Sequence, residues 1–145
     1  MEIILKPIGF VRNEEKSHFG GWNKIVSELV INEEYKDALK GLEDYSHLIV
    51  IFWMRNVKTC DLRHVPQGKK GEVPEVGIFA CRCPQRPNPM GITTVKLVGI
   101  KDNIITVKGL DVTKDTPILD IKPYTPQYDA APDAKTPDWV NKLDY

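Results

Sequence analysis

A proline-rich segment at residues 81–93 limits what this chain can fold into. It reads C-R-C-P-Q-R-P-N-P-M-G-I-T, and its three prolines lie between positions 84 and 89. Proline fixes the backbone angle φ and has no amide N–H, so the segment can form neither a helix interior nor a central strand. The flanking segments, 76–80 and 92–98, are rich in residues that favour strands. The sequence therefore predicts a stiff loop between two strands.

The residues of this segment make it a candidate ligand site. Arg82, Arg86 and Asn88 lie in a backbone whose shape is largely preset. A preorganised loop loses little conformational entropy when a ligand binds. Plain connections between strands are usually shorter, at about two to five residues. The alternative is a proline-rich connector with two solvated arginines.

The rest of the chain predicts six or seven short strands and one short helix. The expected helix begins after Asn32, whose side chain can accept an amide of the first turn, and ends at Gly41. The expected strands lie at residues 3–12, 27–31, 48–54, 76–80, 92–98, 104–107 and 116–124, with 48–54 in the centre because it is the most apolar. This pattern favours a small, mostly antiparallel β-barrel over a parallel βαβ fold. We expect a non-Rossmann protein, because neither a strand followed by G-x-G-x-x-G nor a Walker phosphate loop is present.

The length of 145 residues fits a single domain, residues 1–145, with a Pro/Asp-rich tail from about residue 125 anchored by Trp139. Residues 1–7 lack the basic start and long apolar stretch of a secretory signal. The longest apolar run is far shorter than the roughly 18 residues of a membrane span. These features predict a cytoplasmic protein that does not enter a membrane. Its three cysteines are expected to be reduced rather than bridged.

Positive charge is concentrated around the proline-rich segment, although the net charge of the chain is zero. Residues 55–101 contain nine Lys and Arg against three Asp and Glu, whereas residues 1–54 and 102–145 are both net negative. A local basic surface of this kind can bind phosphates without a high overall pI. Alternatively, these cations pair with the acidic flanks in the folded chain. The sequence leaves both interpretations open.

The cysteines and histidines do not form a convincing metal site. Cys81-x-Cys83 could begin a tetrahedral zinc site, but structural zinc usually needs four ligands at C-x-x-C or paired-histidine spacing. Cys60 and the three histidines show no such spacing, so no metal is predicted. In an extended strand, Asp120 and Lys122 would share one face, while Leu119 and Ile121 would share the other.

Three motifs together resemble a known family. They are L-E-D-Y-S-H-L-I-V-I-F at 42–52, G-I-F-A-C-R-C-P-Q-R-P-N-P-M-G-I-T at 77–93 and D-x-x-x-x-T-P-I-L-D-I-K-P-Y at 111–124. The chain from residue 8 to residue 129 resembles the TsaA-like, or TrmO-like, family of tRNA methyltransferases. The resemblance implies a small β-barrel that binds S-adenosylmethionine, and a homodimer with the cofactor near the subunit interface. It also implies a methyl acceptor, the N6 of a threonylcarbamoyl-modified adenosine beside the tRNA anticodon.

The resemblance further implies which residues contact the cofactor. The matching positions are Gly20, Gly21, Arg55, Asn56, Arg82, Arg86, Asn88, Ile92, Lys114, Asp115, Thr116 and Pro117. The chain departs from the family at two of these segments. Residues 19–22 lack the usual P-R-Q pattern, and Asp115 stands where the family's Asp-Gly-Thr-Pro has glycine, which narrows the backbone options there.

Methyl transfer from a sulfonium is an in-line displacement, so the enzyme's main tasks are alignment and exclusion of water. The acceptor nitrogen must also lose a proton, and His47 and Asp120 are the candidate bases. A lone histidine at the start of the most apolar strand is more often a core residue that donates to a backbone carbonyl, and this interpretation of His47 is favoured over catalysis. Two other functions remain open, namely a non-catalytic S-adenosylmethionine sensor and a methyltransferase that acts on a small metabolite.

Overall fold

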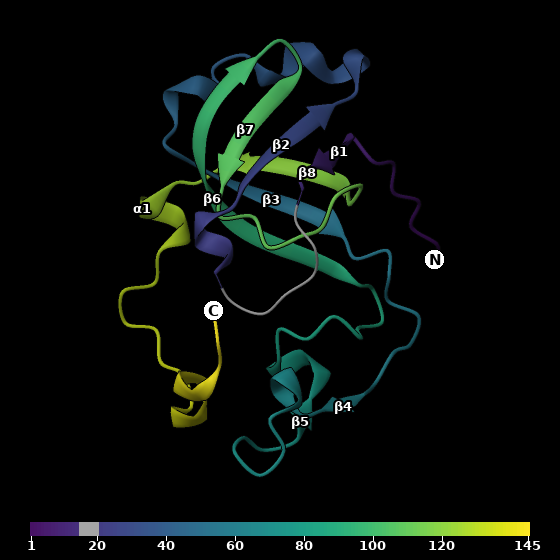
Figure 1. Ribbon diagram of the computed structural model, residues 1–145, viewed down its shortest axis with the longest axis vertical. Coiled ribbons are helices and arrows are strands. Elements are labelled where there is room, and N and C mark those ends of the chain that lie inside the picture. The colour runs from purple at the N-terminus through teal and green to yellow at the C-terminus, as the bar shows by residue number, and fades with distance from the viewer. Residues whose placement is uncertain (15–20) are drawn as a thin grey trace.

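The computed structural model describes residues 1–14 and 21–145. Six strands close into an antiparallel barrel in the order β1-β2-β7-β6-β3-β8 (Figure 1). Their bounds are β1 (Gly9–Arg12), β2 (Val26–Ile31), β3 (His47–Trp53), β6 (Met90–Lys101), β7 (Ile104–Lys108) and β8 (Pro117–Pro123). The predicted small antiparallel barrel is thus confirmed.

The hydrophobic core fills the inside of the barrel. Its buried residues are Val11, Leu29, Ile31, Leu48, Val50, Phe52, Val95, Ile105, Val107, Leu110, Val112 and Ile118. They alternate along each strand with outward residues, as a period of two requires. Closure occurs where β1 pairs with both β2 and β8, and a Cβ on Gly9 would lie 2.2 Å from the carbonyl oxygen of Val30. Only glycine allows this approach.

Strand β3 pairs with β6 and with β8. In a closed barrel every strand has two such neighbours, so β3 holds no central place of the kind expected from its sequence. The pairing with β8 contains a bulge, since Ile51 faces Asp120 while Phe52 faces Ile118. Leu119 is left without a partner in this register. The expectation that Leu119 and Ile121 share a face is therefore wrong: Ile121 packs against the core, whereas Leu119 lines a groove outside the barrel.

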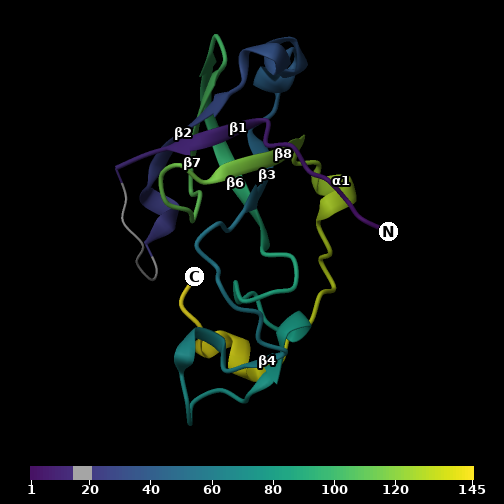
Figure 2. The same ribbon diagram turned by 90° about the vertical axis from the view of Figure 1, so that its right-hand side faces the viewer.

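A small lobe, residues 61–80, lies beyond one end of the barrel (Figure 2). It contains the two-residue strands β4 (Arg63–His64) and β5 (Val76–Gly77), and the 3-10 helices η4 (Pro66–Gly68) and η5 (Ile78–Ala80). The strand expected at 76–80 is thus mostly a 3-10 helix, because only β4 is available to pair with it. The first expected strand is also shorter, since β1 begins at Gly9.

The remaining helices are short. They are η1 (Trp22–Lys24), η2 (Glu33–Leu39), η3 (Leu42–Asp44), α1 (Pro126–Asp129) and η6 (Asp138–Lys142). The helix expected after Asn32 is therefore 3-10, and the Asn32 side chain does not cap it but donates to the carbonyl of Pro7 at 3.3 Å. Among the described residues, no helix is long and apolar enough to cross a membrane.

The tail is tied to the lobe near its end. The side-chain amide of Gln67 donates to the carbonyl of Asp144 at 2.8 Å and accepts from its N–H at 2.9 Å. Lys69 Nζ also lies 2.8 Å from the Asp144 carboxylate. Trp139, the expected anchor, is half-buried. Lys142 adds two further contacts: its carbonyl accepts from Lys69 Nζ at 2.5 Å, and its own Nζ donates to the carbonyl of Glu72 at 3.0 Å.

Candidate functional site

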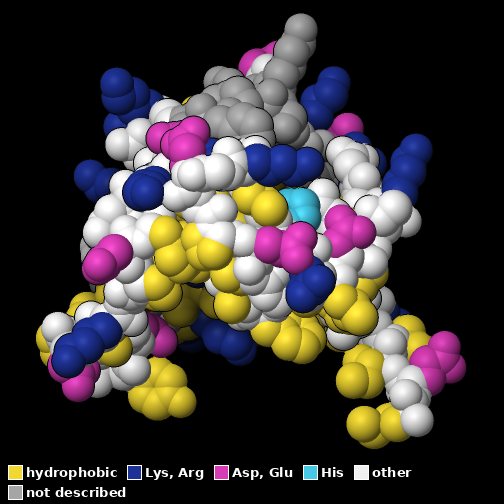
Figure 3. All heavy atoms as spheres, turned by 90° about the horizontal axis from the view of Figure 1, so that it is seen from below, with side chains coloured by type: hydrophobic (Ala, Val, Ile, Leu, Met, Phe, Trp, Pro, Cys, Tyr) yellow, Lys and Arg dark blue, Asp and Glu magenta, His cyan; other side chains and the backbone are white. Residues whose placement is uncertain are grey.

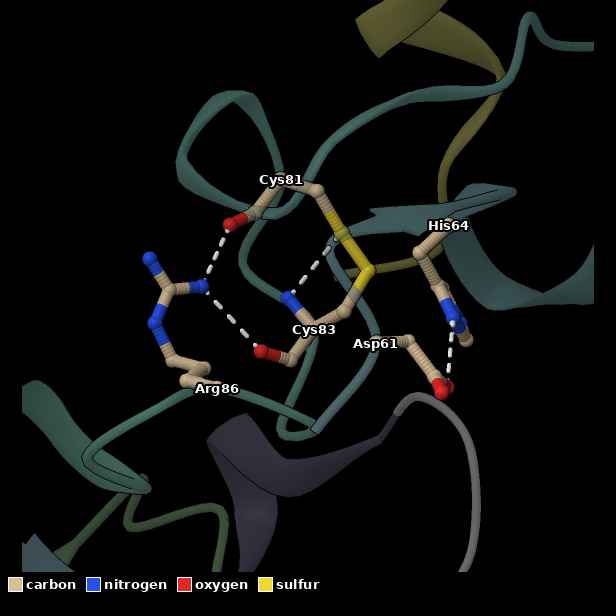
Figure 4. The surroundings of a disulfide bond; sticks show 5 residues. All are labelled: Asp61, His64, Cys81, Cys83 and Arg86. Carbon is tan, nitrogen blue, oxygen red and sulfur yellow. Dashed lines mark hydrogen bonds and ion pairs between the residues drawn. A yellow bond between two sulfur atoms is a disulfide. The ribbon is translucent and has the colours of Figure 1, made fainter. Parts of the chain in front are cut away.

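The Pro-rich loop, residues 81–93, includes the first four residues of β6 and is held in shape by its own side chains. Arg86 Nη1 donates to the carbonyls of Cys81 at 2.7 Å and Cys83 at 3.1 Å (Figure 4). Arg82 Nη2 donates to the carbonyl of Ile92 at 3.0 Å, which ties the two ends of the loop together. These arginine hydrogen bonds, which we call the arginine clamps, stiffen the loop further than its prolines alone.

Cys81 and Cys83 form a disulfide within this loop, which corrects the expectation that all cysteines are reduced. Their Cα atoms are 5.3 Å apart, within the usual range for bridged cysteines. The loop brings both cysteines into one small hydrophobic cluster with Val76 and Ile78. The expectation of reduced cysteines rested on the predicted cellular compartment, and that argument does not show which residues the fold brings together. Cys60 is free and exposed.

An apolar groove of about 360 Å³ lies outside the barrel beside this loop. It is lined by Ile3, Leu5, Pro7, Trp53, Asn88, Met90, Pro117 and Leu119. Asn88 belongs to the Pro-rich loop and Pro117 begins β8, so two predicted cofactor segments meet at one groove. On the underside of the molecule, hydrophobic side chains gather around a hollow bordered by charged groups (Figure 3).

The groove residues other than Asn88 and Pro117 were not predicted from the sequence. Trp53 and Met90 are a cross-strand pair at the end of β3 and the start of β6. Met90 and Ile3 are large apolar side chains that remain 43% and 72% exposed. An apolar side chain at an outward strand position would have been the signal, but it can only be recognised once the strand register is known.

A second predicted pair of segments meets where β3 and β8 approach each other. Arg55 Nη2 lies 3.8 Å from the Asp115 carboxylate. Asp115 has φ of 62°, the left-handed conformation that glycine favours, and its N–H donates to the carbonyl of Val11 at 2.7 Å. The hydroxyl of the buried Thr116 donates to the carbonyl of Thr113 at 2.7 Å.

Asp111 is a further polar residue at this end of the barrel, and it was not among the predicted site residues. Its carboxylate accepts a short hydrogen bond from the hydroxyl of Thr93, the last residue of the Pro-rich loop. The first aspartate of the 111–124 motif could have pointed to it.

The other predicted contact residues are less informative. Asn56 and Lys114 are exposed and make no polar contact with another described side chain. Gly21 is exposed with φ of 73°, and Gly20 lies outside the described residues.

The two candidate bases are not brought together. His47 begins β3, six residues before Trp53, so it lies about 20 Å from the groove at about 3.3 Å per residue. Asp120 follows the groove residue Leu119, but its carboxylate lies 2.8 Å from Lys122 Nζ and also accepts the N–H of Ile121. The hydrogen bond and the charge of Asp120 raise the pKa of Lys122 above its usual 10.5.

The charges of the basic segment are partly neutralised in the fold. Arg63 lies 3.2 Å from Glu75, Lys69 pairs with Asp144, and Arg55 pairs with Asp115. For these three residues, pairing with acidic groups is the correct interpretation. In the described part of the chain, no three His, Cys, Asp or Glu residues form a cluster that could hold a metal.

Comparison with known proteins identifies the family. Residues 17–130 match the model of the tRNA-methyltransferase O N-terminal domain. The chain belongs to this family. The TrmO-like family predicted from the sequence is therefore confirmed, and with it membership of a family of S-adenosylmethionine-dependent methyltransferases.

Individual members of the family are similar to this chain over different shares of their own length. An S-adenosyl-L-methionine-binding protein of Archaeoglobus fulgidus is 39% identical over 88% of this chain and 93% of the relative. A tRNA (adenine(37)-N6)-methyltransferase of Mus musculus is 32% identical over 79% of this chain, but over only 26% of the mouse protein. The crystal structure of TrmO from Pseudomonas aeruginosa superimposes with a TM-score of 0.78 at 28% identity. It covers 95% of this chain, which spans 62% of the TrmO chain.

Proposed function

We propose that this protein transfers the methyl group of S-adenosylmethionine to the N6 of threonylcarbamoyladenosine next to the anticodon of a tRNA. The observation that carries the proposal is the groove. The Pro-rich loop and the T-P segment that begins β8 are far apart in the sequence, and each contributes to its lining. Both carry the motifs of a methyltransferase family, and the groove volume falls within the range of about 300–1,000 Å³ of small-molecule sites.

The residues present fit such a cofactor. The apolar walls suit a purine ring, and Asn88 places an amide among them. Gln85 Oε1, in the same loop, is buried with no hydrogen-bond partner among the described groups, so a donor on the cofactor would satisfy it. Arg82 uses one Nη2 bond for Ile92 and retains further donors for a carboxylate.

When bound, S-adenosylmethionine supplies an activated methyl group on a sulfonium. The chain's own contribution is alignment and exclusion of water. The disulfide and the arginine clamps fix the Pro-rich loop, and the Arg55–Asp115 pair links the ends of β3 and β8. The geometry favours Asp120 over His47 as the base to test, because Asp120 adjoins the groove residue Leu119.

We further propose that two copies of the chain assemble so that the second copy covers the groove. Ile3 and Met90, which line the groove, remain 72% and 43% exposed, and Ile4 and Ile92, close to them in the chain, are 80% and 50% exposed. Exposed apolar patches of this kind mark interaction sites. A stable dimer buries about 1,600 Å² in total. Sedimentation velocity at micromolar concentration tests this, and a fully active monomer would refute it.

A second candidate function is a non-catalytic S-adenosylmethionine sensor. It is favoured by the Archaeoglobus fulgidus relative, which is named only as a binding protein and matches this chain over nearly its whole length. A third candidate, a methyltransferase for a small metabolite, would share the groove but not the need for RNA.

One experiment separates the three functions. The protein is incubated with labelled S-adenosylmethionine and unfractionated tRNA, either from normal cells or from cells that lack the threonylcarbamoyl modification. Transfer of label only to modified tRNA supports the proposal. Binding without transfer to any acceptor supports the sensor, and transfer to a small acceptor but not to tRNA supports the metabolite enzyme.

A further inference from the structure

Two lysines face each other directly on the outside of the barrel. Lys96 of β6 is opposite Lys108 of β7, and on its other side it is opposite His47 of β3. All three side chains are exposed. Directly opposed residues on antiparallel strands point to the same face, so they form a row across three strands about 4.8 Å apart.

Lys24 extends this row at the β7 end. Lys108 is opposite Val26 of β2, and Lys24 lies two residues before Val26 in η1. The N–H of Gly109 donates to the carbonyl of Ile25 at 2.9 Å, which fixes η1 beside the end of β7. We call Lys24, Lys108 and Lys96 the cationic row, and His47 lies at its β3 end.

The charges in the cationic row are not compensated within the described chain. None of its lysines forms an ion pair with a described carboxylate. Glu43 and Asp44, which precede β3, do not pair with them either. Like charges directly opposite each other destabilise a sheet, so the fold gains nothing from the Lys96–Lys108 pair. By contrast, Arg63 and Lys69 of the lobe are each paired with a carboxylate.

An aromatic residue completes the other end of the row. The ring of Tyr124 meets the ring of His47 edge-on at 6.4 Å, and its N–H donates to the His47 carbonyl at 3.0 Å. Single-stranded RNA is bound by lines of cations that follow its phosphates, together with aromatic side chains on which unpaired bases stack. The row and Tyr124 offer both chemistries side by side.

The distance between the row and the groove allows one RNA to contact both. His47 pairs with Lys96 at one end of the β3–β6 ladder, and Trp53 pairs with Met90 at the other. The six residues between them span about 20 Å. An RNA whose acceptor nucleotide enters the groove can thus reach the row with the neighbouring stretch of its backbone.

We propose that the cationic row is the surface that binds the phosphate backbone of the RNA substrate beside the methylated nucleotide. This inference rests on the proposed function, because it assigns the RNA of that reaction to a particular face of the barrel. Of the basic segment 55–101 it selects Lys96, since Arg63 and Lys69 of the lobe already have acidic partners. The lysines act by electrostatic attraction to phosphates and do not touch the reacting atoms.

The test compares Lys96→Glu/Lys108→Glu with the wild type and with Lys101→Glu, which changes an exposed lysine at the far end of the same strand β6. Binding of tRNA is measured by fluorescence anisotropy over a range of salt concentrations, and cofactor binding by calorimetry. We expect the double variant to bind tRNA at least about tenfold more weakly and with a salt slope shallower by roughly 1.5, because two phosphate contacts are lost. Its cofactor affinity and the tRNA affinity of Lys101→Glu should remain within about twofold of wild type.

The outcomes are distinguishable. If the wild type methylates tRNA and the double variant binds and methylates it equally well, the cationic row is not the RNA surface, while the proposed function stands. If Lys101→Glu is as defective as the double variant, the effect is general charge and the assignment fails. If polyglutamate competes as well as poly(U) for the row, the partner is not RNA. If the wild type binds cofactor but no RNA, the proposed function itself fails.

Discussion

The guanidinium of Arg55 lies 3.8 Å from the carboxylate of Asp115, and this contact joins the end of β3 to the turn that precedes β8. Both side chains are about half exposed, so the ion pair itself adds little to stability. Its effect is positional, because Asp115 holds a left-handed turn in which its own N–H bonds to β1.

Two substitutions of Asp115 distinguish the effect of its backbone conformation on stability from the effect of its carboxylate. Asp115→Ala should lower the free energy of unfolding by about 1 kcal/mol, because alanine disfavours positive φ. Asp115→Gly should stay within about 0.5 kcal/mol of wild type, since glycine adopts this φ freely. Urea denaturation measures both, and equal stability of the two variants would show that the turn is not strained by side chains.

Gly91 should be intolerant of a methyl group. A Cβ at this position would lie 2.2 Å from the ring of Phe52, which is buried in the barrel and cannot move aside. Gly91→Ala should therefore destabilise the protein by about 1–3 kcal/mol. Gly99→Ala, on the same strand with nothing within 4 Å, is the matched control and should be nearly neutral. A neutral Gly91→Ala would mean that Phe52 has room to shift.

The two arginines of the Pro-rich loop should differ in effect. Arg82→Ala should weaken cofactor binding about tenfold or more while the fold is kept, because a charge-assisted contact to the cofactor carboxylate is lost. Arg86→Ala should instead destabilise the protein, since its Nη1 bonds two carbonyls within the loop. Calorimetric titration and thermal unfolding measure the two effects. An unchanged dissociation constant for Arg82→Ala would return this residue to the solvated-connector interpretation.

A thiol reagent can measure how many of the three cysteines carry a free thiol. Without reductant, one thiol per chain, that of Cys60, should react with a thiol reagent, because Cys81 and Cys83 are bridged. After reduction and unfolding, three should react. Cys60→Ser serves as the control and should leave no reactive thiol before reduction. Three reactive thiols in untreated protein would contradict the disulfide.

The Asp120–Lys122 pair predicts a pH effect. Because the hydrogen bond and the charge of Asp120 raise the pKa of Lys122 in the folded state, the pair stabilises the protein below the usual pKa of 10.5. That contribution is lost as the pH rises through the raised value. Lys122→Gln should abolish this part of the alkaline loss of stability. An identical alkaline profile in the two proteins would show that the pair does not contribute.

The sequence predicted the barrel because alternation and turn residues are local properties. The pairing of strands depends on residues far apart in the sequence. The predictions that were wrong lie where strand pairing determines the structure. The bulge at Leu119 depends on the register between β8 and β3, and it moves this side chain from the expected face to the groove. The segment after Glu75 is rich in strand-forming residues, yet it has only the two residues of β4 to pair with.

The candidate site was predictable only in part. The sequence motifs pointed to Asn88 and Pro117, which line the groove, and to Arg55, which makes the contact between the ends of β3 and β8. Counting charges could not reveal that Lys69 pairs with Asp144, a residue far along the chain. Nor could it reveal that Lys96 and Lys108 face each other.

Closure of the barrel has a consequence for the rates at which backbone amides exchange with solvent. Each of the six described barrel strands has a hydrogen-bonded neighbour on both sides, so most of their amides can exchange only when the barrel itself opens. The lobe is held by the two-residue strands β4 and β5, which can separate without disturbing the barrel. Deuterium should therefore enter the lobe long before it enters β3. The groove is lined by residues of β3, β6, β8, the Pro-rich loop and the segment before β1, so opening of the lobe can leave its walls in place.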